Sequence, residues 1–117
     1  LAAAHAIHNG LTMLPECHSM YHGEKVAFGT IVQLVLEDAP TEKLEEVLGF
    51  CIELGLPVTM KELGVAELTR EKAMIVAEAA CAPEDTMCNM PFEVTPEMVA
   101  NAILGADALG HYYLMDE

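Results

Sequence analysis

The stretch GEKVAFGTIVQLVLE, residues 23–37, decides the fold class of this 117-residue chain. From Val26 to Leu36 nearly every position is apolar, so a helix here would present apolar side chains on almost every side. Such a helix belongs in the middle of a bundle, where other helices cover it. The run is too short to be a membrane span, which needs ~20 apolar residues. It therefore predicts an all-α domain built around this helix.

Helical periodicity continues on both sides of the central helix, and Pro and Gly separate the segments. The other expected helices cover residues 2–14, 41–54, 60–63, 69/70–80 and 96–109. Thr41 is expected to cap the helix 41–54, whose apolar stripe includes Leu54. Gly55 and Gly110 are expected to end the helices before them. The sequence thus predicts five to six helices bundled around the central apolar helix, in a single domain spanning residues 1–117.

Two shorter signals refine this picture. Thr59 and Glu62 have the spacing of a capping box, which predicts a short helix over residues 60–63. Thr69 or Arg70 is expected to open the following helix.

The charge of the chain excludes several classes of partner. Five Lys and Arg against nineteen Asp and Glu give a formal net charge of -14. Nucleic-acid binding and attachment to anionic membranes both need clustered cations, so neither is expected. Hydrophobic residues make up 53% of the chain, too many for a disordered acidic tail. Cys17, Cys51, Cys81 and Cys88 are widely spaced, which favours buried reduced thiols in a cytoplasmic protein.

Histidines gather near the start of the chain, at His5, His8, His18 and His22. Metal coordination is the chemistry that clustered imidazoles most often serve, but a histidine on an Ala-rich helix is more often a surface or core residue than a ligand. On a helix, His5 and His8 lie about 60° apart around the axis. Spacing alone therefore selects His5 and His8 as the chelating pair. His111, near the end of the chain, is expected to be structural or exposed.

Several motifs resemble a known family. They are AAAHAIHNGLT at 2–12, YHGEKVAFGT at 21–30, NMPF at 89–92 and VTPEMVANAILGAD at 94–107. In this order and spacing they resemble the C-terminal, metal-binding helical domain of the glycerol dehydrogenases, in the iron-containing alcohol dehydrogenase family. The resemblance implies the helical domain of the dehydroquinate synthase-like and iron-alcohol dehydrogenase fold.

The resemblance also implies a metal site that differs from the choice made on spacing. In the family, one Asp and two His hold a divalent metal, with zinc favoured over iron. Carried over to this chain, the two ligands are His5 and His22, and His8 becomes a pocket-lining or supporting residue. The family's Asp and its N-terminal NAD-binding domain precede Leu1 and are absent from this sequence. The chain is therefore expected to be a fragment or a naturally truncated form.

The function that the resemblance implies is oxidation of glycerol to dihydroxyacetone with NAD, when the N-terminal half is present. The chain alone is expected to be inactive. Without a covering domain, apolar faces of the first and last helices would be exposed, which predicts a homo-oligomer. These faces carry Ala2, Ala3, Ala6, Ile7 and Leu11, and Met98, Val99, Ile103 and Leu104.

Two alternatives belong to other functional classes. One is a truncated helical module that self-associates and has no redox activity. The other is a stand-alone metalloprotein, for example one that uses its metal for hydrolysis.

Overall fold

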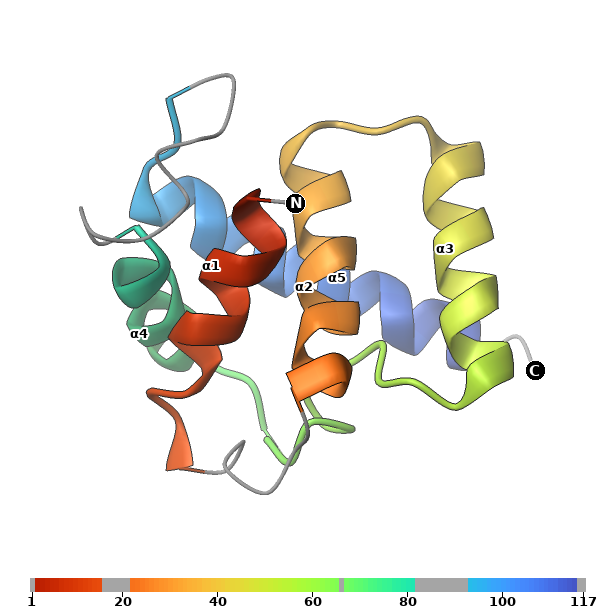
Figure 1. Cartoon of the computed structure of the whole chain (residues 1–117), viewed down its shortest axis with the longest axis horizontal. Coiled ribbons are helices and arrows are strands. Elements are labelled where there is room, and N and C mark those ends of the chain that lie inside the picture. The colour runs from red at the N-terminus through yellow and green to blue at the C-terminus, as the bar shows by residue number, and fades with distance from the viewer. Residues whose placement is uncertain (1, 16–21, 66, 82–92, 116–117) are drawn as a thin grey trace.

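The computed structural model describes residues 2–15, 22–65, 67–81 and 93–115. Over these ranges the chain is helical, without strands, and Figure 1 shows how the helices cross. The helices are α1 (Ala2–Leu11), α2 (His22–Leu36), α3 (Thr41–Leu54), α4 (Arg70–Ala80) and α5 (Pro96–Met115). The predicted all-α class is confirmed.

Helix α2 is the centre of the bundle, as its sequence predicts. It packs against α1, α3 and α5, while α4 packs against α1 and α5. Its side chains Phe28, Ile31 and Val32 are fully buried. Figure 1 shows α1 and α2 side by side and running in opposite directions. The beginning of α2 therefore lies at the same end of this pair as the end of α1.

The helix boundaries confirm some local signals and correct others. Thr69 caps α4, since its Oγ1 accepts a hydrogen bond of 3.2 Å from the Lys72 N–H. Gly55 ends α3 in the left-handed conformation, with φ of 76°. The prediction that Thr41 caps α3 is wrong, because Thr41 is already helical and Pro40 holds the cap position without a side-chain hydrogen bond. Helix α1 ends at Leu11, before the expected residue 14.

The expected stop at Gly110 is also wrong, because α5 continues to Met115. A Cβ atom at Gly110 would overlap the carbonyl oxygen of Val58. Glycine is needed at this position so that the 57–65 segment can lie directly on α5. A glycine inside a helix costs only ~1 kcal/mol relative to alanine, which the tertiary contacts of α5 offset.

The expected short helix 60–63 is a series of turns. Its two polar side chains still form bonds like those of a capping box. The Glu62 N–H donates to Thr59 Oγ1 at 3.1 Å, and the Val58 N–H donates to Glu62 Oε1 at 3.0 Å. The segment buries the apolar side chains of Val58, Met60, Leu63 and Val65. Their spacing of two and three residues does not fit one face of a helix, so packing imposes the turns.

The apolar faces that were expected to be uncovered lie mostly inside this domain. Ala6, Ile7 and Leu11 of α1, and Val99 and Ile103 of α5, are fully buried among their own neighbours. The exposed large apolar side chains are instead Met13, Phe50, Leu54, Ile75, Met98 and Tyr112. Leu54, which was expected to be buried, is 60% exposed because α3 lies at the edge of the bundle (Figure 1). The prediction of an oligomer therefore has to rest on these exposed side chains, and not on the apolar faces that were expected to be uncovered.

Candidate functional site

The pairing of α1 with α2 brings together the two helices that carry the predicted metal ligands. His5 is the fourth residue of α1, and His22 is the first residue of α2. The two helices pack against each other along their length (Figure 1). The side chains of His5 and His22 lie outside the described part of the structure, so their role as ligands stays a prediction.

His8 lies at the margin of the buried face of α1. Its ring Nδ1 lies 3.2 Å from Asn9 Oδ1, and its side chain is partly exposed. The buried face of α1 carries Ala6, Ile7 and Leu11, and helical register places His8 about 60° around the axis from Leu11, at the margin of this face.

The position of α1 depends on a residue that the sequence reasoning overlooked. A Cβ atom at Gly10 would lie 2.5 Å from the carbonyl oxygen of Val76 and 3.0 Å from its Cγ1. Only glycine lets α1 lie this close to α4. The signal was present in the sequence, because a glycine inside a helical pattern often marks a close approach. Gly10 lies two residues after His8, so this contact also fixes the helix that carries His5.

The first turns of α2 are tightly packed as well. Lys25, one turn after His22, is 6% exposed although its side chain is cationic. Its aliphatic stem can pack on apolar neighbours while the ammonium group reaches the edge of the core. Phe28, a turn later, is fully buried. Lys25 and Phe28 therefore hold the first half of α2 against the bundle.

Three of the remaining candidate residues, His18, Cys17 and Cys88, lie outside the described part of the chain. Within the described residues, no group of three or more His, Cys, Asp or Glu is arranged to hold a metal, and no helix is long and apolar enough to cross a membrane. Of the two described cysteines, Cys51 is buried, as expected, and Cys81 is only partly buried. Burial raises the pKa of the Cys51 thiol, which keeps it protonated and unreactive at neutral pH.

The predicted structural or exposed role of His111 agrees with its surroundings. Its side chain is 47% exposed, and Nε2 lies 3.5 Å from Asp107 Oδ2, one helical turn earlier on α5.

Comparisons with known proteins show which proteins this chain is similar to. No family model matches the chain. Glycerol dehydrogenase of Citrobacter freundii is 60% identical over 97% of the chain, and glycolaldehyde reductase of Halobacterium salinarum is 52% identical over 94%. The crystal structure of glycerol dehydrogenase from Schizosaccharomyces pombe matches 99% of the chain with a TM-score of 0.93 and 40% identity.

These relatives are much longer than this chain, which spans 31% of the Citrobacter enzyme and 30% of the Schizosaccharomyces structure. The part that matches is helical, consistent with the helical C-terminal domain that the sequence motifs resemble. The chain is therefore homologous, in sequence and in fold, to a segment that makes up about three-tenths of a glycerol dehydrogenase.

Proposed function

We propose that this chain is the metal-binding domain of an enzyme that oxidises glycerol to dihydroxyacetone with NAD. The observation that carries the proposal is the 60% identity to a glycerol dehydrogenase across almost the whole chain. A relative named for reduction of glycolaldehyde, at 52% identity, widens the substrate class to small hydroxylated alcohols and aldehydes. NAD would bind in the part of such an enzyme that this chain does not cover.

The donor set of the two neighbouring helices fits a divalent metal. His5 and His22 offer neutral imidazoles, which suit zinc and also ferrous iron, and zinc is the metal we propose. A bound metal would act as a Lewis acid that favours the alkoxide form of the substrate. Two protein ligands leave a tetrahedral ion incomplete, so the proposed site would need a third ligand from outside this chain. His8 would line the pocket beside the metal, held by its contact with Asn9.

The purified chain should produce no NADH from glycerol, because hydride transfer requires an acceptor held at near-attack distance. Addition of the remaining N-terminal portion of the Citrobacter freundii enzyme, expressed separately, should restore zinc-dependent NADH formation. Absorbance at the NADH band measures both results. Turnover by this chain alone that requires NAD and metal would contradict the proposal.

Metal binding by the chain should depend on His5 and His22 more than on His8. His5→Ala and His22→Ala should each abolish the zinc signal in a calorimetric titration, because one imidazole alone holds zinc weakly. His8→Ala should retain binding, weakened by roughly 10- to 100-fold, as losses of supporting residues are. His111→Ala, far along the chain on α5, serves as the matched control. Equal loss in His8→Ala and His22→Ala would show that the ligand pair is misassigned.

Self-association is the second proposal, and the exposed side chains Phe50, Leu54 and Tyr112 favour it. Each is 60% exposed, and Phe50 and Tyr112 are aromatic residues, a class that is enriched at protein interfaces. A net charge of -14 opposes association at low salt, and added salt screens this repulsion within ~10 Å at 0.1 M. Light scattering should therefore show a homo-oligomer that strengthens as salt rises. A monodisperse monomer across the whole salt series would exclude it.

A further inference from the structure

Asp107 of α5 joins this helix to the buried 57–65 segment. Its Oδ1 accepts a hydrogen bond of 2.7 Å from the Met60 N–H. Its Oδ2 lies 3.5 Å from His111 Nε2, and its side chain is only 16% exposed. One turn later, Gly110 allows the Val58 carbonyl to lie directly on the helix. These contacts fix the stretch 58–60 to α5 at two adjacent points.

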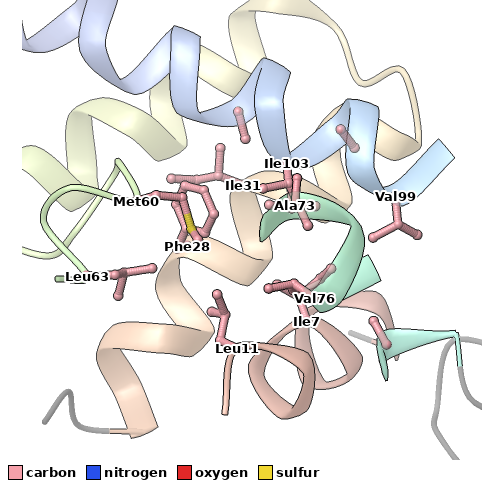
Figure 2. Packing of buried hydrophobic residues seen from close by; sticks show 14 of the residues in the cluster. Ile7, Leu11, Phe28, Ile31, Met60, Leu63, Ala73, Val76, Val99 and Ile103 are labelled. Atoms are coloured by element: carbon pink, nitrogen blue, oxygen red, sulfur yellow. The ribbon is translucent and has the colours of Figure 1, made fainter. Parts of the chain in front are cut away.

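The other side of the same segment packs on the first half of α2. Met60 and Leu63 are fully buried in one core cluster with Phe28. Figure 2 shows the Met60 side chain over the ring of Phe28, with Leu63 beside the same part of α2. Phe28 lies fewer than two helical turns after His22. A line of buried contacts therefore leads from the Asp107 carboxylate to Phe28, in the first half of the helix that carries His22.

We propose that Asp107 is a positioning residue for the metal ligand His22. The inference rests on the function proposed above. Close-packed interiors transmit small displacements, because they contain few voids into which side chains can relax. Metal sites tolerate deviations of only about 0.2 Å in ligand distance. An acceptor oxygen at the position of Oδ1 holds the 57–65 segment, and that segment holds the first turns of α2.

Three substitutions at Asp107 separate a role of its acceptor oxygen from a role of its negative charge. Asp107→Asn keeps an acceptor oxygen at the same place and loses the charge. Asp107→Glu keeps the charge and displaces the oxygen by one methylene, and Asp107→Ala removes the acceptor. We expect Co²⁺ affinity, followed by the visible absorption of the bound ion, to stay near wild type in Asp107→Asn. In Asp107→Glu and Asp107→Ala it should fall by about 10-fold, as for other supporting residues of metal sites.

The reverse order, with Asp107→Glu near wild type and Asp107→Asn weakened, would overturn the proposal in favour of an electrostatic role. The comparison of Asn with Glu also keeps the test decisive if Asp107→Ala does not fold.

Two further variants separate positioning from general destabilisation and from failure of the metal site itself. Val99→Ala removes a buried side chain of the same helix, well away from Met60 and Phe28 (Figure 2). It should lower stability and leave Co²⁺ affinity of the folded protein unchanged, and an equal loss would overturn the positioning role. His22→Ala should abolish Co²⁺ binding. If His22→Ala binds Co²⁺ like wild type, the ligand assignment fails, whereas normal binding by Asp107→Ala alone overturns only this inference.

Discussion

Gly110→Ala should destabilise the chain by about 3 kcal/mol, near the upper end of the range for overpacked sites. The added Cβ would overlap the Val58 carbonyl oxygen and lie 2.7 Å from the Val58 carbonyl carbon and 2.9 Å from Thr59 Cγ2. Two of these atoms belong to the backbone, so no side-chain rotation can relieve the clash. The better helix propensity of alanine returns only ~1 kcal/mol. The clash therefore decides the sign of the effect.

Urea denaturation followed by circular dichroism measures this change. The matched control is Gly105→Ala on the same helix, where the Cβ would meet only Val35 Cγ1 at an ordinary 3.7 Å. This control should leave stability unchanged or raise it by up to ~1 kcal/mol. If both substitutions raise the urea midpoint, the close approach of α5 to the 57–65 segment is wrong. The 58–65 segment should also lose amide protection from hydrogen exchange in Gly110→Ala, because its seat on α5 is displaced.

Phe28→Ala should lower the free energy of unfolding by about 3–5 kcal/mol, through lost burial and the cavity left behind. Phe28 is fully buried at the centre of the bundle, where side chains of α1, the 57–65 segment and α5 gather around α2 (Figure 2). A domain of this length has a total stability of only about 5–15 kcal/mol. The substitution should therefore remove a large share of it, and the variant should be partly unfolded near physiological temperature.

Phe50→Ala provides the same chemical change at the surface, since Phe50 is 60% exposed. Its effect should stay within about 0.5 kcal/mol, as for most surface substitutions. Thermal unfolding of the two variants in parallel tests the central position of Phe28. Similar melting temperatures for both would contradict the packing of α2 at the middle of the bundle.

The candidate site could be predicted from the sequence only in part. The motifs around His5 and His22 select these residues by resemblance, and the structure places their backbones on two adjacent antiparallel helices. Spacing alone selects His5 with His8, because the periodicity of one helix contains no information about a ligand on another helix. The site's third ligand also follows from no pattern within this chain. Gly10 allows the close approach of α1 to α4, and the sequence of α1 alone does not determine where α4 lies.

The sequence by itself determined the all-α class and the central apolar helix, and it narrowed the start of the 69/70–80 helix to Thr69 or Arg70. These features depend on interactions within a few residues, where hydropathy and side-chain chemistry act directly. Only the tertiary structure decided that α5 runs through Gly110, that residues 57–65 form buried turns and that Leu54 stays exposed. The bond that anchors those turns joins Met60 to Asp107, which are 47 residues apart. A local pattern cannot anticipate such a contact, because the free energy that selects it comes from surfaces that meet only after the helices have packed.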